Sequence, residues 1–200
     1  FAFGHSQLAL ALTMVGRFAE ANAEAKLAAD LDPLSPQVLA DAAIAPMFEK
    51  NVPAAKALAK RAADLDPSYF FPVMLEGWID LNAGKFRDAI PPLKKSTTMG
   101  APAFATAYLA YAYGRSGDRA NALVTLEELR KMSSGAPVLP FNLALVYLGL
   151  GDHQRALDYL EQAFVANSQF MPKLGRDAVY DPLRSEPRFA ALLRKMNFVK

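Results

Sequence analysis

The sequence predicts an all-α protein, a solenoid of five helical hairpins followed by a capping segment. Two observations indicate this class. Marker residues return every 33 or 34 positions along the 200-residue chain, which is typical of repeat proteins. Between the markers, apolar residues follow one another at three- and four-residue steps, which is the helical period, and no stretch alternates as a strand does. Each unit is therefore predicted to contain two helices joined by a turn.

The first marker is a turn residue that ends the first helix of each unit. A left-handed backbone conformation is cheapest for glycine, so a repeated glycine is expected where a helix stops and the chain reverses. Five residues further on, alanine recurs, and a small residue there lets the two helices of a hairpin cross closely. The two columns are Gly16, Lys50, Gly84, Gly117 and Gly151, and Ala21, Ala55, Ala89, Ala122 and Ala156.

The ends of the second helices are marked by Ala-Asp-Leu-Asp-Pro, which occurs at 29–33 and again at 63–67. Proline has no N–H group to donate to another helical turn, so these helices are expected to stop there. The predicted units are 2–35, 36–69, 70–102, 103–136 and 137–166. Two irregularities are expected: a kink at Pro46, and a bent or shortened helix at Pro91 and Pro92.

This framework of small residues, glycine and proline resembles the tetratricopeptide repeat. The resemblance covers residues 2–166, and the last unit follows the pattern most closely, with Ala144, Tyr147, Gly151, Ala156 and Ala163 in the expected columns. It implies a right-handed superhelix in which the first helix of each unit lines a concave face. It also implies a non-catalytic module for protein–protein interaction.

Residues 167–200 break the period. Asp181 and Glu186 each precede a proline, which is typical of a helix start, and an amphipathic stripe follows from Phe189 to Met196. We expect this segment to cap the last repeat, as solenoids require. The string at 181–194 is similar to the C-terminal end of bacterial proteins in which such arrays follow a signalling domain. That similarity implies a scaffold or regulatory part of a larger bacterial signalling protein, and the missing initiator Met indicates a chain that continues upstream.

The predicted concave face is apolar and aromatic. Aromatic side chains and methionine are common in the parts of protein interfaces that carry most of the binding energy, so we expect a peptide or protein partner there. A second possibility is that the C-terminal segment or a second copy of the chain covers this face, and homo-oligomerisation is therefore the alternative function. The residues expected to bind a partner are Phe71, Met74, Trp78, Phe104, Tyr108, Tyr111, Phe141 and Asn142.

Composition restricts other functions. The chain has no cysteine and two histidines, so disulfides and cysteine-built metal sites are excluded and no cofactor or metal is expected. A net charge of +2 gives no general attraction to nucleic acid or membranes. The uncharged stretches 96–114 and 133–151 are interrupted by Gly and Pro, which favours a turn followed by a buried helix over a membrane span. We expect a cytoplasmic location, or a periplasmic one if a membrane anchor lies upstream.

One pair of acids could serve an enzyme. Glu76 and Asp80 share a helix face, and if that face is buried the pKa of one of the two carboxyls should rise, as in acid–base pairs of enzymes. The favoured alternative is that this helix is rotated by about one residue, so that Leu75 and Ile79 are buried and both acids face water, because isolated buried acids are costly. Neither His5 nor His153 is expected to be catalytic, and the sequence predicts no enzyme.

Overall fold

The computed structural model describes residues 1–101, 103–132 and 138–197. The turn expected in 133–137 lies outside the described residues, and so do the predicted unit boundaries at 102 and 136. In the described part every regular element is helical. The elements are α1 Ala2–Val15, α2 Phe18–Leu31, α3 Pro36–Ala42, α4 Ile44–Phe48, α5 Val52–Leu65, α6 Phe70–Asn82, α7 Phe86–Thr98, α8 Ala103–Arg115, α9 Arg119–Met132, α10 Pro140–Gly149, α11 His153–Val165, the 3-10 helices η1 Met171–Gly175 and η2 Ala178–Leu183, and α12 Pro187–Lys195.

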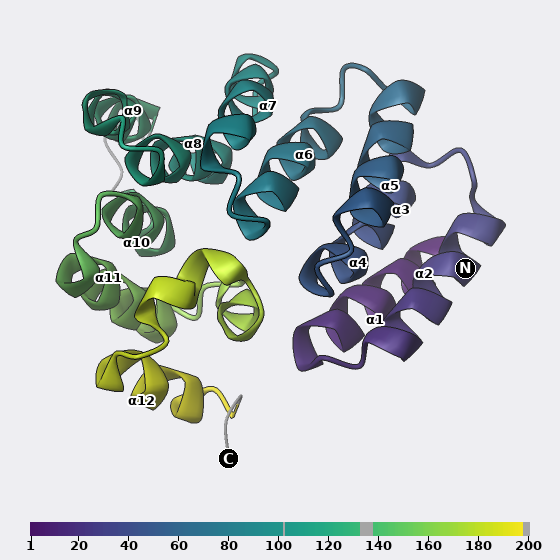
Figure 1. The fold of residues 1–200 in the computed structure, drawn as a ribbon. Helices are drawn as coiled ribbons and strands as arrows, with labels where there is room; N and C mark the ends of the chain where they lie inside the picture. The colour runs from purple at the N-terminus through teal and green to yellow at the C-terminus, as the bar shows by residue number, and fades with distance from the viewer. Residues whose placement is uncertain (102, 133–137, 198–200) are drawn as a thin grey trace.

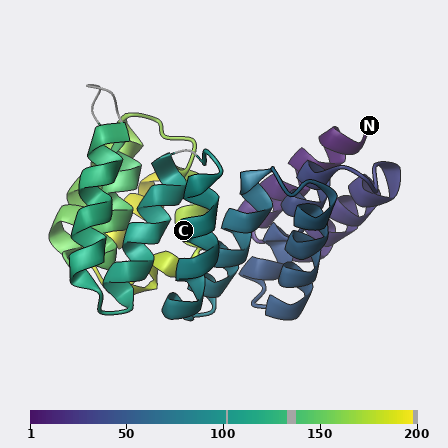
Figure 2. The ribbon, with the colours of Figure 1, turned by 90° about the horizontal axis from the view of Figure 1, so that it is seen from above.

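The helices form consecutive hairpins that stack into a curved solenoid. Each helix packs on its neighbours in sequence, and α8 also packs on α10. Figure 1 shows the resulting arc, which runs from α1 and α2 to α10 and α11 and encloses the yellow-green C-terminal segment. Figure 2 shows the same order from above, with purple α1 at one end and the green hairpins at the other. The all-α solenoid predicted from the sequence is confirmed.

The turn column has the backbone conformation that its glycines predict. The φ angles are 82° at Gly16, 72° at Gly84, 92° at Gly117 and 78° at Gly151. Lys50, the exception in the column, has a φ of 62° and is therefore also left-handed. A side chain makes this conformation unfavourable, so the second turn holds its shape at an energetic cost that the other four avoid.

The prolines have different effects in the two places. Where Pro46 was expected to kink a helix, the helix is divided: α3 ends at Ala42 and α4 begins at Ile44. The expected shortening at Pro91 and Pro92 is not found, because α7 runs unbroken through both. The carbonyls that these prolines leave without a helical donor belong to Arg87 and Asp88, which are exposed, so water can supply the missing hydrogen bond.

Close helix packing in the later repeats depends on two glycines. A Cβ atom added to Gly149 on α10 would lie 2.5 Å from the Cα atom of Tyr111 on α8. One added to Gly114 on α8 would lie 2.4 Å from the carbonyl oxygen of Gly149. The backbones of α8 and α10 therefore touch, which sets the spacing of these two helices along the concave face.

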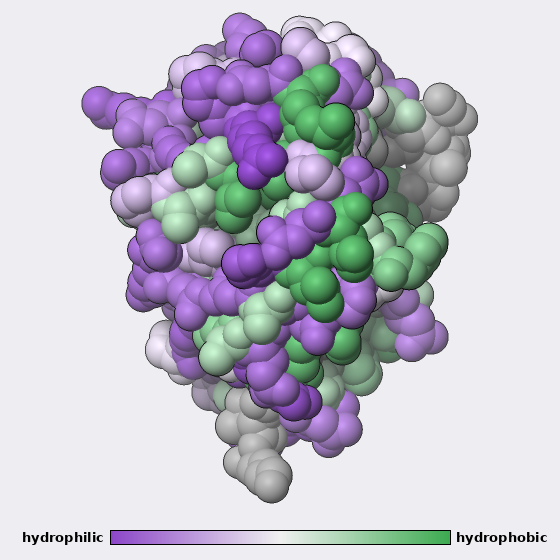
Figure 3. All heavy atoms as spheres, turned by 90° about the vertical axis from the view of Figure 1, so that its right-hand side faces the viewer, coloured by the Kyte–Doolittle hydropathy of each residue, from purple (hydrophilic) through white to green (hydrophobic). Residues whose placement is uncertain are grey.

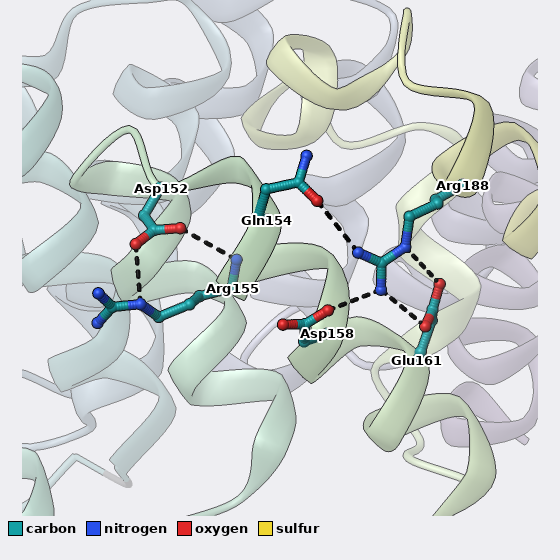
Figure 4. A network of polar contacts seen from close by, with 6 residues as sticks. All are labelled: Asp152, Gln154, Arg155, Asp158, Glu161 and Arg188. Carbon is teal, nitrogen blue, oxygen red and sulfur yellow. Dashed lines mark hydrogen bonds and ion pairs between the residues drawn. The ribbon is translucent and has the colours of Figure 1, made fainter.

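The C-terminal helix α12 packs on the last hairpin, and its Arg188 makes the polar contacts to α11. Arg188 donates to Asp158 at 2.7 Å, to Glu161 at 2.9 Å and to Gln154 at 3.3 Å, all on α11 (Figure 4). At the start of α11, Asp152 accepts the backbone N–H of Arg155 at 3.0 Å and pairs with its guanidinium at 2.9 Å, as Figure 4 also shows.

Two further observations concern membrane spans and metal sites. In the described ranges, the structure contains no helix long and apolar enough to span a bilayer. The same residues include no cluster of three or more His, Asp or Glu side chains that could hold a metal ion.

Candidate partner-binding face

The residues predicted to bind a partner lie together on the inner side of the arc, but most are covered. Phe71 and Phe104 are half-buried, and the other six are buried: Met74, Trp78, Tyr108, Tyr111, Phe141 and Asn142. The cover is the chain's own segment 170–183, which includes η1 and η2 and lies against α6, α8 and α10. We call it the groove segment.

The groove segment places a lysine in a cage of aromatic rings. Lys173 Nζ lies 4.8 Å from the ring centre of Trp78, 5.1 Å from that of Tyr108, and 4.9 Å from those of Phe141 and Phe170. It also donates a hydrogen bond to the Tyr108 hydroxyl at 2.8 Å. Ring faces attract a cation, yet they replace water only in part. Burial lowers the pKa of Lys173 from 10.5 to about 8.

Asp177, four residues after Lys173, adds a second buried charge to the contact between the groove segment and the concave face. Asp177 is fully buried and accepts hydrogen bonds from the Trp78 indole at 2.9 Å, the Val179 N–H at 3.1 Å and the Tyr108 hydroxyl at 3.4 Å. Burial raises the pKa of the Asp177 carboxyl, while the charge of Lys173 opposes that rise. Tyr108 therefore stands between a buried cation and a buried anion and hydrogen-bonds to both.

Three further hydrogen bonds hold the groove segment at residues 176–179. Asn82 of α6 accepts the N–H of Ala178 at 3.0 Å, and the hydroxyl of Tyr111 donates to the carbonyl of Val179 at 3.1 Å. On the opposite wall, Arg176 donates to the carbonyl of Val15 at the end of α1, a contact of 3.1 Å between residues 161 positions apart. The segment thus joins the first hairpin to the third and fourth across the groove.

A pocket of about 430 Å³ remains open between the groove segment and the first hairpin. Five of the predicted residues line it: Phe71, Met74, Trp78, Phe104 and Tyr108. The facing wall comes from α1, with Leu10 and Met14, and from the groove segment, with Phe170. Its size and apolar lining are typical of ligand or side-chain pockets. Tyr111 and Phe141 lie outside it and contact the groove segment, and Asn142 is buried and does not line the pocket either.

Comparison with known proteins identifies the fold. No protein-family model and no curated protein matches the chain. Among solved structures, TTC0263, a thermophilic TPR protein of Thermus thermophilus, is similar at 19% identity and a TM-score of 0.65, over 90% of this chain and 98% of that one. The MamA RS-1 ArsTM double mutant is similar at 19% identity and a TM-score of 0.54, over 84% and 96%. The chain has the tetratricopeptide-repeat fold. This fold is generally a non-enzymatic interaction module with an extended concave surface.

In this tetratricopeptide array the C-terminal segment does more than the predicted cap. Its last helix, α12, packs on the last repeat, but the groove segment turns back into the concave face, which was only one of the alternatives that the sequence left open. Lys173 and Asp177 were not singled out from the sequence. The available signals were two charges four residues apart among the aromatic residues Phe170 and Tyr180.

The acid pair on α6 differs from the favoured interpretation. Leu75 and Ile79 are buried as expected, but Asp80 is buried as well and pairs with Lys56 of α5 at 2.6 Å. Only Glu76 is half-exposed, and burial raises the pKa of its carboxyl. The expectation that both acids face water is wrong because α6 is covered by neighbouring repeats on two sides and by the groove segment, which leaves little of its surface free.

The two histidines of the array have acidic partners on neighbouring elements. His5 Nδ1 lies 2.6 Å from a carboxylate oxygen of Glu24 on α2, and His153 Nδ1 lies 3.8 Å from Glu186 before α12. These contacts join elements of the array, and both histidines lie outside the pocket.

Proposed function

We propose that this chain is a non-catalytic protein-interaction module that binds a peptide or protein partner at the open part of its concave face. The partner inserts an apolar or aromatic side chain into the pocket between α1, α6, α8 and the groove segment. The observation that carries this proposal is the pocket itself, because it gathers five of the predicted residues in one concave, apolar site. Phe71 and Phe104 are the anchors, since they are half-exposed there.

The role that we propose for the module is regulatory. The similarity of residues 181–194 to the ends of bacterial signalling proteins supports a scaffold that follows an effector domain. The groove segment supports the same role, because it already occupies the deep half of the face and so confines the partner to one end of it. A confined site favours selective binding of one apolar anchor over adhesion along the whole groove.

A peptide-display selection tests the proposal with no need to identify the partner first. Immobilised protein should enrich peptides with aromatic or large aliphatic side chains. Phe71→Ala or Phe104→Ala should weaken the selected peptides at least tenfold, since an anchor in a pocket is worth about 2 kcal/mol or more. Leu123→Ala, a control on α9 where the side chain is 43% exposed, should leave binding unchanged. Selected peptides that bind both phenylalanine variants as well as the original protein would contradict the proposed site.

Homo-oligomerisation is the second candidate, and a different surface favours it. Helix α1 exposes Phe3, Leu8 and Val15, whose side chains are 53%, 46% and 57% accessible, and it contains no Lys, Arg, Asp or Glu. Figure 3, seen from the side of the N-terminal hairpins, shows apolar residues gathered in a band on this side of the molecule. Contiguous apolar patches of this kind are uncommon on monomers.

Light scattering over a concentration series separates the two candidates. A dimer that forms through α1 should dissociate on dilution, and Leu8→Lys should abolish it while leaving peptide binding in the pocket intact. A strict monomer at all concentrations would exclude this alternative and would leave the pocket proposal standing.

A further inference from the structure

The lining of the pocket includes one buried lysine, Lys173. Fourteen residues line the pocket, and Lys173 is the single charged one among these described residues; the rest are aliphatic, aromatic or uncharged polar side chains. A site with an apolar wall and a single cation selects ligands with the complementary pattern, an apolar body and one negative charge.

The ammonium of Lys173 is incompletely satisfied. It has three N–H donors, and within the described part of the chain its hydrogen-bond acceptor is the Tyr108 hydroxyl, while the rings of Trp78, Phe141 and Phe170 have their centres 4.8–4.9 Å away. Asp177, the nearest anion in the segment, already accepts hydrogen bonds from Trp78, Tyr108 and Val179. The cage therefore leaves a buried cation with hydrogen-bonding capacity, and a carboxylate could use it with a charge-assisted bond.

We propose that the pocket is a binding site for a small amphipathic carboxylate, a molecule with an aliphatic tail of medium length and one terminal carboxylate. The tail would lie among Leu10, Phe71 and Phe104, and the carboxylate would lie toward Lys173. This goes beyond the proposed partner binding, because the ligand is a small molecule. It would also occupy the place of the partner's anchor, so that ligand and partner would exclude one another.

The charge preference depends on pH through Lys173. The titratable groups around its ammonium are Tyr108 of α8 and Asp177, while α6 and α10 present the rings of Trp78 and Phe141. The α1 wall contributes only uncharged side chains to the pocket. Because the lysine loses its proton more easily than an exposed lysine does, preference for an anion should be full near pH 6.5 and should fall near pH 9.5.

The chain's single tryptophan is a built-in reporter, since Trp78 lines the pocket. The experiment titrates the protein with decanoate, decanol and decyltrimethylammonium below their micelle concentrations and follows Trp78 fluorescence at pH 6.5 and 9.5. We expect decanoate to bind at least tenfold more tightly than decanol at pH 6.5, with the ratio falling at pH 9.5 and the cation binding weakest. Equal binding of the three probes, or no binding, would overturn the proposal.

Two variants locate the charge. Lys173→Met keeps an unbranched apolar stem and should abolish the preference for decanoate over decanol. Lys85→Met, an exposed lysine outside the pocket, should retain it. If Lys173→Met does not fold, the pH series on the unaltered protein still decides. The two proposals fail separately, because peptide selection does not depend on the probes and the probe titration does not depend on a peptide.

Discussion

Raising the pH from 7 to 9.5 should stabilise the folded chain by about 2 kcal/mol through Lys173 alone. Burial lowers the pKa of this lysine from 10.5 in the unfolded chain to about 8 in the folded one. Between these two values the unfolded chain binds a proton that the folded chain has released, so the free energy of unfolding increases with pH. The gain begins near pH 8 and would reach about 3 kcal/mol above pH 10.5, at about 1.4 kcal/mol per pH unit.

The assay is urea unfolding at pH 7, 8, 9 and 9.5 for the original protein and for Lys173→Met. The difference between the two unfolding free energies at each pH isolates the contribution of Lys173 to stability. Lys85→Met serves as a control, because Lys85 is exposed. The series stops at pH 9.5 because burial raises the pKa of Tyr108, Tyr111 and Tyr180, so these groups would destabilise the fold above about pH 10. Parallel pH profiles for the protein and Lys173→Met would refute the reasoning that Lys173 is buried without adequate compensation.

Three further predictions concern stability and are checked by the same unfolding assay. Lys50→Gly should stabilise the fold by about 1 kcal/mol, because the backbone φ angle at this residue is 62°. Ala57→Gly, inside α5, should destabilise the fold by a similar amount. A loss of stability on Lys50→Gly would contradict the claim that the left-handed backbone at Lys50 is strained. Gly149→Ala should cost about 1–3 kcal/mol, because its Cβ would lie 2.5 Å from the backbone of Tyr111, and an unchanged stability would show that α8 and α10 can separate. Tyr180→Phe should leave stability unchanged or raise it by about 1 kcal/mol, because within the described residues its buried hydroxyl has no hydrogen-bond partner, and a clear loss would reveal one.

The repeat was predictable because its physical requirements are local. Each hairpin needs a left-handed turn and a small residue at the helix crossing, and these needs recur at a fixed spacing that one sequence displays. Even Lys50 was located correctly by its column, although its residue type argues against a left-handed turn. The eight predicted face residues were brought together for the same reason, since they occupy first helices of successive units.

The path of residues 170–183 was not predictable in the same way. Its decisive contacts join residues far apart in sequence, Trp78 with Asp177 and Val15 with Arg176, and no period marks such pairs. The burial of Asp80 was missed for a similar reason, because its counter-charge, Lys56, comes from the preceding hairpin. For the two buried acids, Asp177 and Asp80, the partners that come from other parts of the fold, rather than the charge itself, determine the burial.

The Trp78 indole N–H gives the most direct test of the central claim, that the chain's own groove segment fills the deep half of the concave face. As the single tryptophan, Trp78 contributes one indole signal to an ¹⁵N–¹H NMR spectrum. Because this N–H donates to the buried Asp177, the signal should exchange slowly with solvent and should shift on Asp177→Asn. A signal that exchanges as rapidly as that of a free indole, and is unmoved by Asp177→Asn, would show that the face is open and the account wrong.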